Sequence, residues 1–181
     1  ITSTSTDRLI IFRIKKWLES RHTVKQNPPR TLRSKFQFAL KIGNKEIYDS
    51  LMSLGLYHNK SLTIGMPEIP PRFFTHFIRG YFDGDGCVHL ERSRGRKQDI
   101  ILRRLSIIFT SGSKKFLIDL LEILRKNMSL HQEKIYSSHR SFQLRFSTGD
   151  TVALFKFLYH KAPKDLFFER KFNIFREYFK L

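Results

Sequence analysis

Residues 78–86, Ile-Arg-Gly-Tyr-Phe-Asp-Gly-Asp-Gly, decide the fold of this chain. Apolar residues recur at three- and four-residue spacing through this stretch and just before it, which predicts an amphipathic helix over 72–85. Gly80 and Gly84 lie four apart on one face of that helix, where the missing side chains let a second backbone approach closely. The last acid, Asp85, falls at the C-terminal end, where the helix dipole disfavours negative charge. An acid at that position indicates a bound cation.

The acids of this stretch also have a plainer interpretation. Asp-Gly-Asp-Gly runs end helices before a turn, here with Gly86 as the cap. The complete stretch is more specific, and it resembles the name motif of the LAGLIDADG homing endonucleases in residue class at every position. Four positions hold residues other than those of the name motif: Arg79, Tyr81, Phe82 and Gly84. The Pro-Pro approach to the helix from Ile69 and the tail over 158–172 resemble the same family, so the resemblance covers nearly the whole chain.

The composition indicates a nucleic-acid partner. Among 181 residues, 34 are Lys or Arg and 16 are Asp or Glu, a formal net charge of +18. This excess favours nucleic acid first and an anionic membrane surface second, with a merely solvated basic surface as the third alternative. No apolar run approaches the roughly 18 residues of a membrane-spanning helix. The 18 Phe residues and a hydrophobic content of 40% indicate a folded domain rather than a disordered basic arm.

The cysteine and histidine content excludes several classes of site. A single cysteine, Cys87, allows no internal disulfide and indicates a reducing compartment, so we expect an intracellular protein, organellar or prokaryotic. The 7 histidines form no HxH or HxxxH pair, which argues against a zinc constellation. The sequence also holds no Walker loop and no serine-hydrolase elbow.

The chain contains an internal repeat with an offset of 106 residues. This offset aligns Gln37 with Gln143, and it superimposes helical stripes at 10–18 and 116–124. Alternating apolar residues predict a strand in each copy, at 35–42 and 141–147. The remaining predicted helices and strands are at 46–54, 87–91, 100–110, 151–159 and 166–179.

These patterns and the resemblance together predict the fold class: α+β, a duplicated αββαββα LAGLIDADG homing-endonuclease fold with pseudo-twofold symmetry, in which antiparallel DNA-binding sheets pack on helices. We expect the first repeat at 1–68 and the second, complete repeat at 69–181. Because the counterpart of Asp85 falls about twenty residues before Ile1 by the same offset, we expect the first motif helix upstream of this sequence. The resemblance implies a monomer that carries both motifs, of intron-encoded or intein type.

The resemblance implies a Mg²⁺ site at the end of the motif helix. Family members pack two motif helices at the centre, and each helix delivers its last acid to a shared metal site. By motif position that acid is Asp85, with the Gly84 carbonyl as a second ligand. Hard oxygen ligands suit Mg²⁺, which acidifies a water and neutralises charge on a scissile phosphate. Several family members carry a lysine that organises the attacking water, but those positions hold Thr6 and Gly112 here. The substitutes by rough position are Lys41 and Lys114, for which a solvated phosphate contact or a surface lysine is the favoured alternative.

Alternation also assigns polar side chains to one face of each predicted sheet, where they can read base edges in the major groove. These residues are Lys35, Gln37, Lys41, Arg104, Ser106, Gln143 and Arg145. Each good Gln–adenine or Arg–guanine pair contributes roughly 1–3 kcal/mol of discrimination. Other basic residues are expected to hold phosphates of double-stranded DNA: Arg30, Arg33, Arg92, Arg94, Arg96, Lys97 and Arg140. A solvated sheet face with no ligand is the alternative.

Three functions are compatible with these patterns. The leading hypothesis is a site-specific, Mg²⁺-dependent endonuclease that cuts double-stranded DNA. A catalytically inactive descendant, acting as a DNA-binding regulator or as an RNA maturase in intron splicing, would keep the basic sheets without needing both acids. A general basic nucleic-acid-binding domain would need neither a metal nor Asp85.

Overall fold

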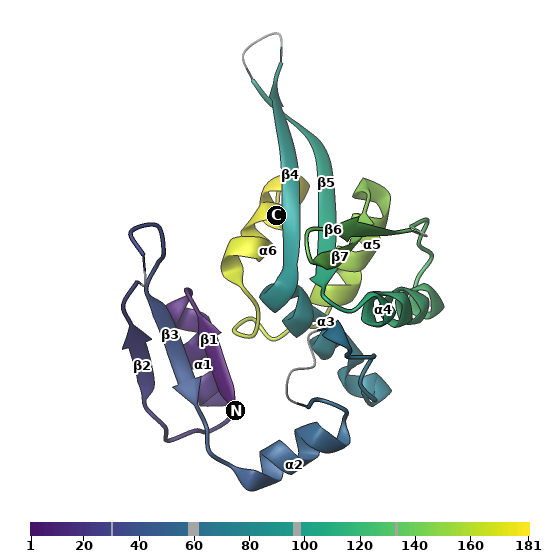
Figure 1. Cartoon of the computed structure of the whole chain (residues 1–181). Helices are drawn as coiled ribbons and strands as arrows, with labels where there is room; N and C mark the ends of the chain where they lie inside the picture. The colour runs from purple at the N-terminus through teal and green to yellow at the C-terminus, as the bar shows by residue number, and fades with distance from the viewer. Residues whose placement is uncertain (30, 58–61, 96–98, 133) are drawn as a thin grey trace. The chain divides into compact units, whose positions relative to one another are not determined.

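The structure is a computed structural model that describes residues 1–181 except 30, 58–61, 96–98 and 133. The described residues form six helices and seven strands in two antiparallel sheets, an α+β fold (Figure 1). They divide into two compact units. Unit 1 comprises Ile1–Ser53 and Pro163–Phe167, and unit 2 comprises Leu54–Ala162 and Phe168–Leu181.

Unit 1 is a three-stranded sheet with two helices. Its strands are β1 (Thr2–Ser5), β2 (Val24–Asn27) and β3 (Gln37–Lys41), in the order β1-β3-β2. Helix α1 (Arg8–Trp17) begins after Asp7, whose side chain accepts the N–H of Leu9, and it buries Ile10 and Ile11. Helix α2 (Lys45–Ser53) is amphipathic, but none of its residues is buried.

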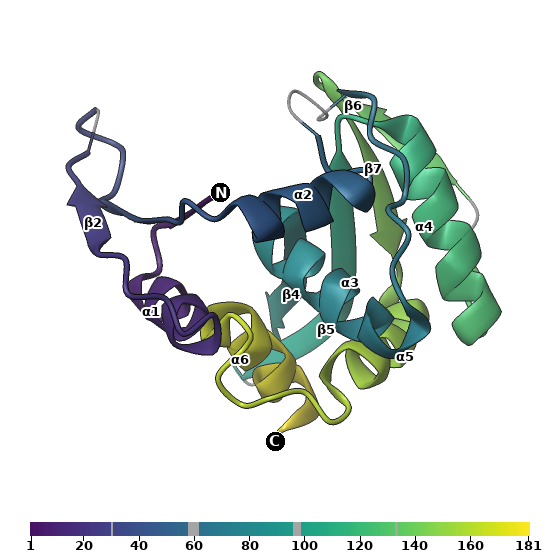
Figure 2. The same ribbon diagram turned by 90° about the horizontal axis from the view of Figure 1, so that it is seen from below.

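Unit 2 is a four-stranded antiparallel sheet with four helices. The strands, in the order β4-β5-β7-β6, are β4 (Gly86–Arg94), β5 (Ile100–Ser111), β6 (Ile135–Ser138) and β7 (Ser141–Phe146). The helices are α3 (Pro71–Asp85), α4 (Lys114–Asn127), α5 (Thr148–Tyr159) and α6 (Glu169–Phe179). Figure 2 shows these helices along the sheet.

The core of unit 2 lies between the sheet and the helices. Alternate residues of β5, among them Leu105, Ile107 and Phe109, are fully buried and form one cluster with Phe82 of α3 and Phe175 of α6. The rings of Phe82 and Phe109 meet edge to face at 5.9 Å between centroids. Because successive strand residues point to opposite faces, burial of one set leaves the other set on an outer, helix-free face.

Helix α3 confirms the predicted helix to within one residue. It begins at Pro71, where proline costs nothing because the first helical N–H has no partner within the helix. It ends at Asp85, and the Gly86 N–H donates to the Phe82 carbonyl. Gly86 has an ordinary φ of −84°. A Cβ there would lie 2.5 Å from the Phe82 carbonyl oxygen, so close backbone approach is what requires glycine.

The two units repeat one strand order, β1-β3-β2 in unit 1 and β5-β7-β6 in unit 2. The offset of 106 holds from β1 to α1, but it fails at both of the strands that follow. Leu40 pairs with Ser3 in unit 1, whereas Leu144 pairs with Phe109 in unit 2, so β3 and β7 are 104 residues apart. Val24 pairs with Leu40 and Ile135 with Leu144, so the hairpin that ends in β3 spans 16 positions and the one that ends in β7 spans 9. A longer path from the helix to β6 offsets part of this difference, which leaves unit 2 two residues shorter. The predicted equivalence of Gln37 and Gln143 is therefore wrong.

Some element boundaries differ from those predicted. Strand β3 begins at Gln37 rather than 35, and Phe36 is left 50% exposed. Helix α6 begins at Glu169 rather than 166, because a turn comes first in which the Leu166 N–H donates to the Pro163 carbonyl. Strand β4 runs on to Arg94 in a long hairpin with β5 (Figure 1).

Candidate functional site

A buried ammonium group closes the C-terminal end of α3. Lys171 of α6 is 4% exposed, and its Nζ donates to the carbonyl oxygens of Phe82 (2.6 Å), Asp83 (2.8 Å) and Gly86 (2.6 Å). The bonds satisfy carbonyls at a helix end and place positive charge where the helix dipole is negative. Burial lowers the pKa of Lys171 to about 8, although the charge of Asp83 opposes this shift. The chain itself therefore supplies one cation at this end.

Asp83 is buried in the same region, and only 6% of it is exposed. Its Oδ2 accepts the Phe168 N–H at 3.0 Å, while its Oδ1 has no hydrogen bond from the described residues. Burial raises the pKa of Asp83 to about 6, against the opposing effects of that hydrogen bond and of the charges on Lys171 and Arg79. Asp83 thus differs in environment from the acid two residues later.

Asp85 is exposed and faces a pocket. The pocket has a volume of about 530 Å³, and its lining includes Tyr81, Thr110 and Ser111. The Tyr81 hydroxyl donates to the Thr110 carbonyl at 2.6 Å, which ties α3 to the end of β5. Burial is the main cause that raises the pKa of Tyr81, and the negative charge of Asp85 adds to it. Asp85 therefore stands at the junction of α3, β4 and β5 with its carboxylate accessible.

The described residues contain no group of three or more His, Cys, Asp or Glu side chains able to hold a metal. A carboxylate at an open pocket and nearby backbone carbonyls are hard oxygen donors, the type that Mg²⁺ prefers. The donor chemistry at Asp85 therefore fits a divalent cation. Within the described part of the chain, the ligand set is incomplete.

Gly80 and Gly84 lie on an open face of α3. Both are exposed, and apart from the adjacent residues and the backbone of α3 itself, no atom of the described residues lies within 4 Å of a Cβ built on either one. The predicted close approach of a second helix at these glycines is thus not made by any described residue. The face has room for one.

The outer face of the unit 2 sheet brings together polar residues from three strands. A groove of about 770 Å³ on this face is lined in part by Arg104, Ser106 and Arg145. The Arg145 Nε donates to Gln143 Oε1 at 2.9 Å, and its guanidinium lies 5.1 Å from the Tyr136 ring centroid. Four residues predicted to contact DNA therefore share one face.

A β-bulge adds an arginine to this face that alternation did not predict. Leu90 pairs with Leu105 and Arg92 with Leu102, so β5 has one extra residue between these pairs. The Arg103 Nε reaches Ser93 Oγ at 2.8 Å, and the Arg104 Nε lies 4.0 Å from Glu91. The only sequence signal for this bulge was Arg103 itself, a charged residue where alternation along the predicted strand expects an apolar one.

The other predicted DNA contacts are spread more widely. Arg92 makes a two-point ion pair with Glu177 of α6, which raises the pKa of Arg92 and lowers that of Glu177. Lys114 is exposed at the start of α4 and does not line the Asp85 pocket. The remaining described residues are exposed: Arg33, Lys35, Gln37, Lys41, Arg94 and Arg140. Arg30, Arg96 and Lys97 lie outside the described residues.

With this geometry in place, the chain can be compared with known proteins. Residues 73–156 match the family model described as a LAGLIDADG-like domain. The chain carries a LAGLIDADG-like domain. A comparison with curated proteins finds no match.

Two solved structures of the meganuclease I-SmaMI share the fold of this chain. The meganuclease I-SmaMI bound to uncleaveable DNA is 11% identical with a TM-score of 0.58, over 99% of this chain and 77% of that one. I-SmaMI bound to uncleaved DNA with calcium ions is also 11% identical, with a TM-score of 0.54 over the same shares. An archaeal intron-encoded homing endonuclease, I-Vdi141I, complexed with DNA, is 16% identical with a TM-score of 0.43, over 60% of this chain and 67% of that one.

The LAGLIDADG-like domain matches the described motif helix, the sheet and α4, and it extends into α5. Lys171 lies beyond the matched segment, and sequence reasoning missed it along with the burial of Asp83 and Arg79. The spacing of charged residues in α6 does not distinguish the buried Lys171 from the exposed charged residues on either side of it. None of the helices that the described residues form is long and apolar enough to cross a bilayer.

Proposed function

We propose that this chain acts in the site-specific hydrolysis of double-stranded DNA, with Asp85 as one carboxylate of a divalent-metal site. The observation that carries the proposal is the contrast at the end of α3. Asp83 is buried beside a lysine, whereas Asp85 is accessible at an open pocket where α3, β4 and β5 meet. Since the two acids are only two residues apart, this arrangement leaves one of them available for a ligand.

The outer sheet face supports DNA as the substrate. Arg103, Arg104 and Arg145 project from β5 and β7, and Gln143 is held by its bond to Arg145. Arginine and glutamine recognise guanine and adenine edges through paired hydrogen bonds. The net charge of +18 supports binding to phosphates along a long target. The structural relative I-SmaMI was solved with DNA.

A Mg²⁺ ion held by Asp85 and the Gly84 carbonyl would acidify a water and neutralise charge on the scissile phosphate. In this proposal Lys171 is a positioning residue. Its three bonds hold the carbonyls of Phe82, Asp83 and Gly86, which fixes the backbone on both sides of Gly84 and Asp85. The Arg104 and Arg145 side chains bind and orient the duplex. The roles of Lys41 and Lys114 in organising a water stay predictions.

Cutting both strands requires a second acid. We expect it on a second motif helix packed against the open face at Gly80 and Gly84. The room at both glycines supports such packing, because two helix backbones approach closely where neither carries side chains.

A catalytically inactive DNA-binding descendant is the second candidate. One observation favours it: the described residues hold no group of three metal-ligating side chains. Such a protein would use the same sheet face, and its DNA binding would need neither Mg²⁺ nor Asp85.

The test begins with selection of a bound duplex from a random-sequence library by the full chain without Mg²⁺. Cleavage or nicking of that duplex is then measured with Mg²⁺ for the wild type, for Asp85→Asn and for a matched control, Glu122→Gln, which neutralises an exposed acid of α4. We expect Asp85→Asn to lower the cleavage rate by at least about 100-fold, because the metal loses its charged ligand, and to change duplex affinity by less than about threefold.

The outcomes separate the candidates. Equal cleavage by Asp85→Asn and the wild type would show that Asp85 is not the metal ligand. Selective binding without any strand cutting by the wild type would favour the inactive descendant. Loss of activity in Glu122→Gln as well would point to a general effect of the lost charge rather than to the site.

A further inference from the structure

A second pocket, of about 710 Å³, lies on the helical side of unit 2 between α3, α5 and α6. Its volume falls in the range of about 300–1,000 Å³ that is typical of small-molecule sites. The pocket shares no lining residue with the Asp85 pocket or with the sheet groove. It is therefore separate from the proposed nuclease site and from the proposed duplex interface.

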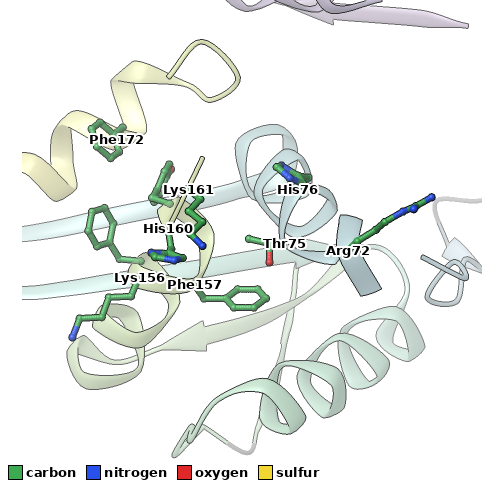
Figure 3. A pocket seen from close by; sticks show the side chains of 10 residues that line it. Arg72, Thr75, His76, Lys156, Phe157, His160, Lys161 and Phe172 are labelled. Atoms are coloured by element: carbon green, nitrogen blue, oxygen red, sulfur yellow. The ribbon is translucent and has the colours of Figure 1, made fainter. Parts of the chain in front are cut away.

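The lining of this pocket is basic. Five of its residues carry basic side chains and are exposed: Arg72, His76, Lys156, His160 and Lys161. None of the residues that line it is acidic. Figure 3 shows the Lys161 side chain directed toward Thr75 of α3 with His160 next to it, whereas Arg72 and Lys156 extend outward at the sides. An anion in the pocket would thus be surrounded by donors.

A buried arginine orients one of these donors. The Arg79 Nη2 lies 2.7 Å from His76 Nδ1, and its Nη1 donates to the Leu158 carbonyl at 2.9 Å. Because a guanidinium can only donate, His76 Nδ1 must be the acceptor, and the neutral ring then carries its proton on Nε2. The bond also fixes the ring plane. His76 therefore offers its remaining N–H as a donor.

Aromatic rings form the apolar part of the pocket. The Phe155 and Phe172 rings lie nearly parallel, with 6.0 Å between centroids and 25° between planes. Phe157 lines the pocket as well, and all three side chains are partly accessible. Proteins bind unpaired nucleotides by stacking the base on accessible aromatic rings and by placing cationic side chains around the phosphate. This pocket offers both kinds of group.

Lys161 occupies an unusual backbone position. It follows the end of α5 with a φ of +54°, a left-handed conformation that glycine adopts without strain and that costs other residues free energy. A glycine would suit this backbone better. The chain instead places a long cationic side chain there, at the pocket.

We propose that this pocket binds one nucleotide unit of a single-stranded nucleic acid. The phosphate lies among Lys161, His160 and His76, and the base lies against the phenylalanine rings. Bases in a duplex keep their ring faces within the stack, so an intact duplex cannot use the rings. A free nucleotide has the same chemistry as one unit of a strand, and the experiment below distinguishes these two sources.

The test uses Lys161→Gly in the full chain. Glycine relaxes the left-handed backbone, so this variant should unfold at the same temperature as the wild type or higher. Lys180→Gly is a matched control, because Lys180 also follows a helix at positive φ (+55°), is exposed, and does not line the pocket. Binding of a labelled single-stranded hexanucleotide is measured by fluorescence anisotropy at about 0.15 M salt, where long-range charge effects are screened.

We expect Lys161→Gly to weaken hexanucleotide binding by at least tenfold and Lys180→Gly to change it less than twofold. Adenosine monophosphate is titrated in parallel. If the hexanucleotide binds saturably and adenosine monophosphate does not, the ligand is a single strand. If adenosine monophosphate binds as tightly as the hexanucleotide, and Lys161→Gly weakens both equally, the ligand is a free nucleotide. Equal weakening by both glycine variants would overturn the proposal, as would full displacement of the hexanucleotide by a duplex competitor.

Discussion

Units 1 and 2 build the same strand order with very different cores. In unit 2, α4 buries five residues and α5 four, whereas in unit 1 the corresponding helices α1 and α2 bury two and none. The hydrophobic spacing of α2 is as clear as that of the buried helices. What differs is α3, which places Phe74, Ile78 and Phe82 against the unit 2 sheet.

Amphipathic helices in this chain therefore bury their apolar faces extensively only in the unit where a central helix, α3, packs against the sheet. Among the described residues, unit 1 has no counterpart of α3 or β4. Its large apolar side chains accordingly stay accessible, with Trp17 52% and Tyr48 40% exposed. Three substitutions on α3 test what this helix contributes to unit 2.

Phe82→Ala should lower the free energy of unfolding by about 3–5 kcal/mol. The ring is 0% exposed and contacts rings on both the sheet and α6, so the change leaves a cavity as well as losing buried area. Phe36→Ala in unit 1 should change it by no more than about 0.5 kcal/mol, because that ring is 50% exposed. Denaturant unfolding of both variants measures the difference. Equal losses would break the contrast between the two cores.

Asp83→Asn should change how stability depends on pH. The pKa of Asp83 is raised from 3.8 to about 6, so the folded chain holds this proton more tightly than the unfolded chain does. The stability from that proton is complete below about pH 4 and is lost as pH rises through 6. The free energy of unfolding of Asp83→Asn, taken relative to that of the wild type, should therefore increase by on the order of 2 kcal/mol as the pH rises from 4 to 7. Urea unfolding across this range measures the gain.

The control for this experiment is Asp49→Asn, which removes an exposed acid on α2 of unit 1. It separates the burial of Asp83 from the general effect of losing one negative charge. A constant difference between Asp83→Asn and the wild type from pH 4 to 7 would contradict a buried, proton-binding carboxyl at the end of α3.

Gly80→Ala has the smallest expected effect, a gain of at most about 1 kcal/mol in the free energy of unfolding. Alanine is the better helix former, and its Cβ would meet no atom of the described residues within 4 Å. Gly86→Ala is the contrasting variant and should destabilise, because its Cβ would lie 2.5 Å from the Phe82 carbonyl oxygen. Thermal unfolding compares them. A loss of stability in Gly80→Ala would show that another helix occupies this face.

Periodicity was sufficient to predict α3 and the inner and outer faces of β5 and β7. It placed Arg104, Ser106 and Arg145 on one face, because side chains alternate along a strand and apolar residues mark the buried side. It failed at Arg103, since a bulge shifts the alternation by one residue. A repeat offset taken without gaps also failed at β3, because the connections differ in length.

The site was harder to predict than the fold because its supporting contacts are remote in sequence. Asp83 and Asp85 look alike in the motif, and the fold alone makes one buried and the other accessible. What separates them is Lys171 with the backbone of Phe168, more than eighty residues away. Local spacing carries no information about such a contact.

Under the proposed function, the Lys171 ammonium at the end of α3 also sets the order in which a growing chain acquires its parts. Its bonds join residues 85 to 89 positions apart, so they cannot form until α6 has been synthesised. A nascent chain that ends before α6 has the arginines proposed to bind DNA, but it lacks the hydrogen bonds that hold the backbone on both sides of Asp85. In that proposal, the residues that bind the duplex are synthesised before the lysine that positions the metal ligand.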